Sequence, residues 1–299
     1  MSLYSLLDKV TDGTDKKLSW FLDFAEEFLE FTQFGESSTP NIQADIISQN
    51  ENNYHFIQYR DDGHHCVTRP INSDLFVKIK DFSNYKRTFV EALPHIQDFK
   101  NDEVTRKTIN VILYTCQQSV GCVLDALNNS NKAKKLNGNY FEILIRNTVK
   151  ACGLNVDDHD EVLPLPNTNE TTKFEHDIIL LNEKKEEKAI GQLKTSSKDR
   201  IDKMFLDKFM YNKLKEVDIP HFAVFLNDVQ QAKDDKKAVY KIGSTFLPGH
   251  FKTYTIALNP LDGVYYLDLR PAITNDPFLN ARIKTFDNFL VNDMWAFIK

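Results

Sequence analysis

The sequence has 299 residues, of which 41% are hydrophobic and 27% are charged. These values are ordinary for folded proteins and exclude a chain that is disordered throughout. The length suits one large domain or two unequal ones, and no run of apolar residues is long enough for a membrane-spanning helix. The first 17 residues lack the basic stretch, apolar core and small cleavage residues of a signal peptide. We therefore expect a soluble protein of the cytoplasm.

The net charge of −6 and the pI of about 5.8 argue against a protein whose whole surface binds nucleic acid. The positive charge is nevertheless unevenly spread. Residues 184–215 contain ten Lys or Arg in 32 positions, whereas Arg60 is the only one between Phe21 and Asp62. The sequence is therefore compatible with a local basic cleft built around residues 184–215.

The four cysteines are Cys66, Cys116, Cys122 and Cys152, and none of them forms a C-x-x-C pair. So few cysteines in a chain of this length indicate free thiols in a reducing compartment. The segment Gly63-His-His-Cys66 has zinc-binding residue types, but zinc requires four ligands and no partner pair is evident. We expect this segment to be a loop.

Much of the first 135 residues has apolar side chains at helical spacing. Residues 18–31 and 104–128 show the clearest helical patterns, and residues 74–99 have room for one or two helices. We expect residues 1–135 to form a mostly helical region and residues 136–299 to form a second region with a different organisation.

Strands and helices alternate after Gly138. The expected elements are a helix at 140–152 that ends at Gly153, strands at 156–165, 173–181 and 189–196, a helix at 198–216 capped by Ser196 or Ser197, strands at 221–226, 254–258 and 264–269, and a closing helix at 276–299. A charged turn joins the strands at 173–181 and 189–196 into a hairpin, and Asp262-Gly263 is a turn signal between the last two strands. This order predicts a mixed α/β (α+β) core with polar chemistry on its central hairpin.

The hairpin carries polar residues inside otherwise apolar strands. Alternate residues of a strand share a face, which groups Glu175 with Asp177 and Gln192 with Lys194. Mg²⁺ prefers oxygen ligands, which the Asp177 carboxylate, the Gln192 amide oxygen and the Leu193 carbonyl can supply. Lys194 can then deprotonate or orient a water molecule, or stabilise negative charge at phosphorus. This set of groups is what phosphodiester hydrolysis requires.

In these residues the sequence resembles the PD-(D/E)xK, or restriction-endonuclease-like, superfamily. Its members place a Glu on a helix before the first strand, an Asp at the second strand, and an acidic-x-Lys triplet on the third. Here Glu142 lies in the matching helix, Asp177 matches the aspartate, and the triplet reads Gln192-Leu193-Lys194. His176 replaces the usual Pro, and Gln192 replaces the usual acidic residue and removes one negative charge. The resemblance covers roughly residues 138–230.

The resemblance implies a mixed central sheet flanked by helices and a Mg²⁺-dependent endonuclease, with Mn²⁺ able to substitute. Asp177, Gln192, the Leu193 carbonyl and Glu142 would then hold the metal, and Lys194 would assist the nucleophilic water. Family members closest in organisation are type II restriction enzymes, which act on double-stranded DNA as homodimers and accompany a DNA methyltransferase. In that case residues 1–135 would serve DNA contact or dimerisation, and residues 136–299 would form the nuclease core with its C-terminal strands and helix.

The residues that follow the triplet are hydroxylic and basic: Thr195, Ser196, Ser197, Lys198 and Arg200. They suit phosphate contact at a helix N-terminus, and equally an ordinary helix cap. Two other functions remain open at this point. One is a repair or RNA-processing nuclease of the same fold. The other is a catalytically silent DNA-binding protein with a weakened metal site, which the substitution at Gln192 allows.

Overall fold

The computed structural model describes residues 2–12, 16–34, 44–48, 53–59, 66–198, 200–234 and 239–299. The chain forms two compact units, and each contains segments that are distant in the sequence. Unit 1 consists of Met1–Ala92, Lys107–Asn147 and Val229–Ser244; unit 2 consists of Leu93–Arg106, Thr148–Asp228 and Thr245–Lys299. The boundary expected after residue 135 falls inside helix α5 (Ser130–Ala151), which contributes to both units.

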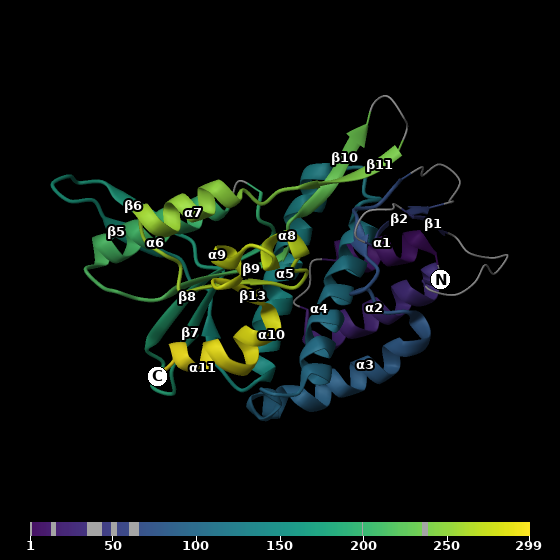
Figure 1. The fold of residues 1–299 in the computed structure, drawn as a ribbon, viewed down its shortest axis with the longest axis horizontal. Helices are drawn as coiled ribbons and strands as arrows, with labels where there is room; N and C mark the ends of the chain where they lie inside the picture. The colour runs from purple at the N-terminus through teal and green to yellow at the C-terminus, as the bar shows by residue number, and fades with distance from the viewer. Residues whose placement is uncertain are drawn as a thin grey trace. The chain divides into compact units, whose positions relative to one another are not determined.

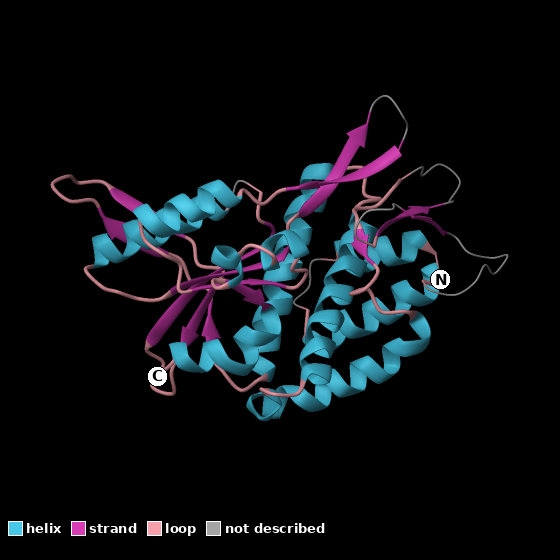
Figure 2. Ribbon diagram, viewed as in Figure 1, coloured by secondary structure: helices cyan, strands magenta, loops and turns pink. Residues whose placement is uncertain are grey.

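Unit 1 is mostly helical, as Figures 1 and 2 show. Its helices are α1 (Leu3–Thr11), α2 (Leu18–Thr32), α3 (Ile79–Ala92), most of α4 (Glu103–Leu124) and most of α5. The helices expected at residues 18–31 and 104–128 are confirmed. α4 is buried on nearly all sides between Thr108 and Leu124, so it buries polar side chains such as Gln117 and Gln118 as well as the apolar face that the sequence predicts.

The strands of unit 1 form two small antiparallel sheets. One has the order β1 (Ala44–Ser48), β2 (Tyr54–Tyr59), β3 (Ile71–Asn72), and the other is the ribbon of β10 (Val229–Asp234) and β11 (Val239–Ser244). The ring of Phe56 on β2 lies 5.6 Å from the ring of Tyr240 on β11. This contact fixes which face of the ribbon is turned toward the rest of unit 1.

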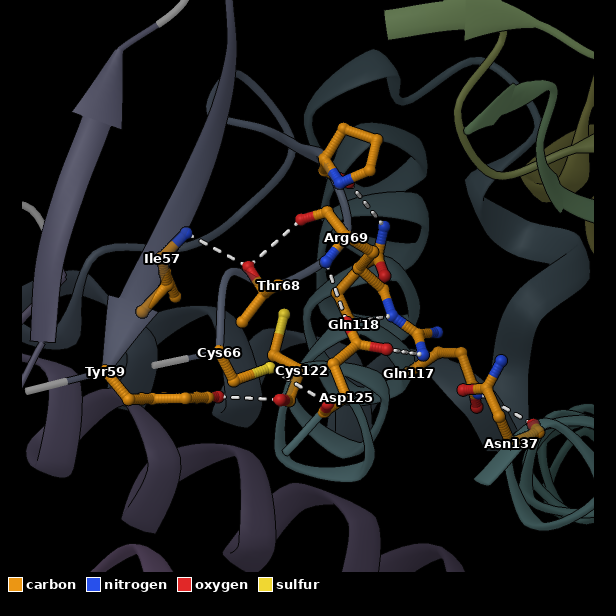
Figure 3. Close-up of polar contacts among 11 residues, drawn as sticks. Ile57, Tyr59, Cys66, Thr68, Arg69, Gln117, Gln118, Cys122, Asp125 and Asn137 are labelled. Atoms are coloured by element: carbon orange, nitrogen blue, oxygen red, sulfur yellow. Dashed lines mark hydrogen bonds and ion pairs between the residues drawn. The ribbon is translucent and has the colours of Figure 1, made fainter. Parts of the chain in front are cut away.

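A half-buried ion pair joins the loop before β3 to the end of α4 (Figure 3). The guanidinium of Arg69 donates through Nε and Nη2 to the two carboxylate oxygens of Asp125 at 2.9 and 2.7 Å, and its backbone N–H donates to the same carboxylate at 2.7 Å. Gly121 lies one helical turn before Asp125, and a Cβ atom there would overlap the Arg69 guanidinium. A glycine inside a helix costs about 1 kcal/mol relative to alanine. The close approach of Arg69 explains why α4 has one at this position.

Cys66 lies in the same cluster, where its thiol donates to the Asp125 carbonyl at 2.9 Å. Burial raises the pKa of this thiol to about 11, so it is protonated and unsuited to bind zinc. His64 and His65, the other residues of the segment considered for zinc, lie outside the described residues. All four cysteines are free, as expected.

Unit 2 is built around a six-stranded mixed sheet, and this confirms the expected fold class (Figure 2). The order is β13 (Ile283–Thr285), β12 (Gly263–Tyr266), β9 (His221–Asn227), β8 (Glu187–Ser196), β7 (Ile178–Leu181), β4 (Asn155–Asp157). The pairs β4–β7 and β7–β8 are antiparallel, whereas the pairs β8–β9, β9–β12 and β12–β13 are parallel. A separate hairpin pairs β5 (Glu161–Pro164) with β6 (Thr171–Phe174).

Helices cover both faces of this sheet. The helical segments of unit 2 are 3₁₀ turn Leu93–Phe99, α6 (Ile201–Lys215), α7 (Pro248–Ala257), α8 (Pro271–Thr274), α9 (Pro277–Asn280), α10 (Phe286–Asn288), π turn Phe289–Asp293 and α11 (Met294–Phe297). On one face, α6 through α9 pack on Phe225 of β9 and Tyr266 of β12. On the other, Phe289 of the C-terminal helical segment lies against Phe222 and Tyr265 at ring distances of 4.8 and 5.1 Å. The sheet is therefore buried on both faces.

Five of the expected elements are wrong or incomplete. Residues 254–257 belong to helix α7 and Leu258 is its C-cap, so Asp262-Gly263 joins a helix to β12 and is not a hairpin turn. Their apolar pattern resembled a strand, but Phe251, Tyr254 and Leu258 pack on the core at helical spacing. Residues 173–181 and 156–165 each divide between two strands of different sheets, and the closing helix is interrupted by β13. The helix expected at 198–216 begins at Ile201, and no side chain caps it.

Within the described parts of the chain, no helix combines the length and apolar character needed to cross a bilayer.

Candidate active site

Asp177 lies at the break between β6 and β7, immediately before Ile178. The register of the hairpin pairs Ile178 with Gly191, and this places Asp177 beside the triplet that follows on β8. The Asp177 Oδ2 atom accepts a hydrogen bond from the Leu193 amide at 2.7 Å and another from Lys194 Nζ. The predicted meeting of Asp177 and Lys194 at the hairpin is therefore present, although Asp177 precedes its strand instead of lying within it.

Gly191 explains how the hairpin packs so closely at this point. A Cβ atom at this position would collide with the side chains of Phe222 on β9 and Ile178 on β7. β8 lies between these two strands in the sheet. The glycine therefore lets the ring of Phe222 and the side chain of Ile178 fill the space next to the triplet, and this fixes the backbone from which Gln192 and Lys194 project.

Gln192 lies beside the break in the preceding strand. Its Nε2 atom donates to the backbone carbonyl of Glu175 at 3.1 Å. That hydrogen bond identifies the nitrogen end of the amide, so the oxygen is the end that remains for a metal ion or a water molecule. That the carbonyl of Leu193 and the amide oxygen of Gln192 bind a metal ion stays a prediction.

These residues line a small hollow of about 100 Å³. Its lining residues come from the hairpin and from the start of α6, and they are Glu175, Asp177, Gln192, Lys194, Arg200, Lys203 and Met204. The Asp177 side chain is only 12% exposed and that of Lys194 is 26% exposed. Partial burial strengthens the attraction between opposite charges and the binding of anions near the cations. The hollow can therefore accept a phosphate group beside a carboxylate.

Asp207 on α6 was not among the predicted site residues, but its carboxylate lies 3.8 Å from the Nζ atom of Lys203, which lines the hollow. Its pKa is raised, mainly by burial; the charges of Lys203 and Lys194 act to lower it and that of Asp177 acts to raise it further. The sequence did contain a signal, because Asp207 stands among the inward residues Met204 and Tyr211 of an amphipathic helix, where a carboxylate is expected only with a partner or a function.

Two acidic side chains and an amide oxygen match the preference of Mg²⁺, which typically binds one or two carboxylates and keeps several waters. No group of three or more His, Cys, Asp or Glu side chains in the described residues is arranged as a ready metal cluster. The oxygen donors that line the hollow, on Asp177, Glu175 and Gln192, nevertheless fit a hard ion bound largely through water. It does not fit zinc, since no thiol or imidazole is among the residues that line the hollow.

Glu142, the fourth predicted ligand, lies half-buried on α5 within unit 1. The other three predicted site residues lie in unit 2. Its role at the metal stays a prediction.

The residues expected to contact phosphate differ in accessibility. Ser197 is only 1% exposed, and its hydroxyl lies 3.1 Å from that of Thr245. Ser196 also donates to Thr245, at 3.2 Å, and accepts from the Lys198 amide. Lys198 and Arg200 are exposed, and Thr195 is half-buried. The cations of this segment are therefore better placed than its hydroxyls to reach a ligand.

His176 is buried and lies edge-on to Tyr211 of α6, with ring centroids 5.2 Å apart. Burial lowers the pKa of His176, so the ring is neutral near neutral pH. His159, which lies in the acidic segment 157–161, is ion-paired with Asp157 and Glu187 at 3.2 Å each when protonated.

Comparison with solved structures identifies the fold. The crystal structure of the type IIP restriction endonuclease Kpn2I matches 94% of this chain and 90% of that protein, with a TM-score of 0.67 and 19% sequence identity. The chain has a restriction-endonuclease fold. A second match, the complex of restriction endonuclease PspGI with substrate DNA, covers 72% of this chain and 92% of that one, with a TM-score of 0.38 and 15% identity. No protein-family model and no curated protein sequence matches the chain.

Proposed function

We propose that this protein is a Mg²⁺-dependent endodeoxyribonuclease that cleaves double-stranded DNA at specific sequences, in the manner of a type II restriction enzyme. The observation that carries the proposal is the meeting of Asp177, Lys194 and the Leu193 amide at one carboxylate oxygen, on the edge of a hollow rich in cations. The restriction-endonuclease fold, shared with Kpn2I over nearly the whole chain, supports it.

The roles of the side chains follow from their chemistry. Asp177 and Asp207, with the amide oxygen of Gln192, would hold the divalent ion, and Glu142 is a further candidate. A bound Mg²⁺ supplies charge neutralisation at the phosphate and a more acidic water. Mn²⁺ offers similar coordination preferences and is expected to substitute.

Lys194 is placed to orient the attacking water, because its Nζ is held by Asp177. An ammonium at this position also stabilises the charge that develops on the phosphate oxygens. Arg200 and Lys203 at the rim of the hollow, together with the neighbouring Lys198, would bind the DNA backbone. Such contacts position the duplex but do not read its sequence.

Two-fold DNA sites are most simply cut by two-fold proteins, so we propose that the enzyme acts as a homodimer. A DNA methyltransferase that protects the host site would complete such a system. The helical N-terminal region is proposed to take part in DNA contact or dimerisation.

The test is incubation of the purified protein with supercoiled plasmid in Mg²⁺, in Mn²⁺ and in EDTA. Discrete fragments that require the divalent ion are expected from the wild-type protein. Asp177→Ala and Lys194→Ala should abolish cutting while the circular dichroism spectrum stays unchanged. Glu183→Ala and Lys184→Ala, on the exposed turn between β7 and β8, serve as matched controls and should cut normally.

Other outcomes separate the alternatives. Smeared products would indicate a non-specific nuclease of the repair or RNA-processing kind. A parallel assay with an RNA substrate distinguishes these two, because only the RNA-processing nuclease is expected to cut RNA. DNA binding without cleavage in either metal would indicate the catalytically silent protein that the substitution at Gln192 leaves open. Full activity of Asp177→Ala or Lys194→Ala would refute the assignment of the site.

A further inference from the structure

The ribbon of β10 and β11 is an insertion between β9 and α7 that belongs to unit 1 and not to the central sheet. Within the described residues it pairs with no third strand. Its base is closed on the side of unit 2 by a hydrogen bond from the Thr245 amide to the Asp228 carbonyl at 2.6 Å, and the Asp228 carboxylate is held by Arg270 at 2.6 and 2.9 Å. The two ends of the ribbon are therefore firmly fixed.

The two faces of the ribbon differ in character. Residues directly opposite in an antiparallel pair share a face. Tyr240, which contacts Phe56, therefore lies on the same face as Ile242 and Gln231, and this face is turned toward the rest of unit 1. The opposite face presents two cross-strand pairs, Gln230 with Gly243 and Ala232 with Lys241. Gln230 and Lys241 are both exposed.

The outer face combines long polar and small side chains in a diagonal arrangement. Gly243 and Ala232 are close neighbours: a Cβ atom on Gly243 would lie 3.7 Å from that of Ala232, an ordinary contact distance. Between the long side chains of Gln230 and Lys241, the ribbon surface therefore has no side chain larger than a methyl group. Gln230 and Lys241 stand at opposite corners of it, with a separation of about 7–8 Å between their backbone positions, as is usual for diagonal neighbours.

These features match the major groove of duplex DNA. The groove is about 12 Å wide and admits a two-stranded antiparallel ribbon. Small side chains let the backbone of the ribbon approach the base edges. In the major groove Gln forms hydrogen bonds with adenine, Lys forms them with guanine, and the methyl group of Ala contacts thymine. A separation of about 7–8 Å corresponds to roughly two base-pair steps of about 3.4 Å. The segment 229–244 contains four lysines and two aspartates, a positive balance in a chain of net charge −6.

We propose that the outer face of the β10–β11 ribbon enters the DNA major groove and that Gln230 and Lys241 read base edges there. The inference rests on the proposed nuclease function and adds to it the surface that determines sequence preference. Gln231, on the opposite face, is a matched control for Gln230, and Lys184, on the exposed turn before β8, is a control for Lys241.

The experiment measures sequence preference separately from activity. Cleavage sites of the wild-type protein are first determined by sequencing the ends of cut genomic DNA. Duplexes that carry the resulting site, and every single-base substitution of it, are then cut by the wild type, Gln230→Ala, Lys241→Ala, Gln231→Ala and Lys184→Ala. Gln230→Ala and Lys241→Ala should each lose roughly tenfold or more of the preference at one or two adjacent base pairs. Gln231→Ala and Lys184→Ala should keep the wild-type preference.

Two results would overturn the ribbon assignment while leaving the nuclease in place. One is an unchanged preference at every base pair in both outer-face variants. The other is a uniform weakening across all sequences with a smaller salt dependence, which is the signature of a phosphate contact. A wild-type protein that cuts no duplex at all would instead refute the proposed function itself.

Discussion

Asp177 and Lys194 are joined through the same carboxylate oxygen that accepts the amide of Leu193. Strand β8 thus supplies a side-chain cation and a backbone N–H donor to the carboxylate of Asp177, which lies just before β7. The pair is mostly sheltered from solvent, with side-chain exposures of 12% for Asp177 and 26% for Lys194. Its geometry is set by the register of β7 against β8, so substitutions here test function more directly than stability.

Replacing Lys194 with Met keeps the length of the side chain but removes its charge. We expect the single-turnover rate of DNA cleavage to fall by about 100-fold or more, the usual size of a lost proton-transfer or charge-stabilising group. DNA binding, measured in Ca²⁺ by fluorescence anisotropy, should change by less than about tenfold. A variant whose rate falls only because it no longer binds DNA would contradict the assigned role.

Replacing Asp207 with Asn tests the carboxylate that the sequence analysis missed. If Asp207 helps to hold the divalent ion, the Mg²⁺ concentration needed for half-maximal cleavage should rise by about tenfold or more. Asp218→Asn, an exposed change at the end of α6, is the control and should leave the metal requirement unchanged.

Gln192→Glu in the Asp207→Asn background tests whether a carboxylate on the strand can replace one on the helix. We expect it to recover part of the lost metal affinity, because it returns a negative charge to the same site. The recovery should be incomplete, since Gln192 would lose its donor to the Glu175 carbonyl. An identical metal requirement in the wild type and in Asp207→Asn would show that Asp207 is not a ligand.

Gly121→Ala should destabilise the protein by about 2 kcal/mol, even though alanine is the better helix former. The added methyl group would displace the Arg69 guanidinium, which Asp125 holds by two hydrogen bonds. Gly138→Ala is the matched control, because a Cβ atom at Gly138 on α5 meets nothing within 4 Å. That change should stabilise the protein by about 0.5–1 kcal/mol. Urea unfolding followed by circular dichroism measures both, and equal effects of the same sign would contradict the explanation.

His221 makes stability depend on pH. Burial lowers the pKa of this side chain to about 4, and its Nδ1 donates to the Ile219 carbonyl at 2.9 Å. The unfolded chain takes up a proton near pH 6.5, whereas the folded protein does so only near pH 4. The contribution of His221 is therefore complete above about pH 6.5 and is lost as the pH falls toward 4, a change of about 3 kcal/mol.

His221→Gln keeps a hydrogen-bond donor but does not titrate. Its free energy of unfolding should decline less steeply than that of the wild type between pH 6.5 and pH 4.5. His176, whose pKa is also lowered by burial, adds to the decline in both proteins. Parallel pH profiles for the wild type and His221→Gln would rule out this role for His221.

Several helices and strands could be predicted from the spacing of apolar residues and from turn residues alone. The helices α2 and α4, the hairpin of β7 and β8, the buried strand β9 and the stop at Gly153 all followed from spacing and turn chemistry. The nearness of Asp177 to the Gln192–Lys194 triplet also followed, because a short turn leaves two strands little choice of partner. The side-chain period of two then sets which residues share a face.

Contacts between distant segments decided the rest. Residues 173–181 look like one strand, but β6 pairs with β5 and β7 with β8, and Asp177 lies at the resulting break. Residues 254–258 have the composition of a strand, but they are helical because Phe251 and Tyr254 pack on α6. The start of α6 became part of the site only through its packing on the sheet, which brings Lys203 and Met204 to the hollow.

The sequence by itself determined the fold class and the hairpin that carries Asp177 and Lys194, because both depend on short-range periodicity and short connections. Only the tertiary structure decided that the start of α6 joins them and that the β10–β11 ribbon belongs to unit 1. The physical reason is the same in both cases. Which segments pair or pack across long stretches of chain depends on the total surface they bury together, and no window of neighbouring residues contains that information.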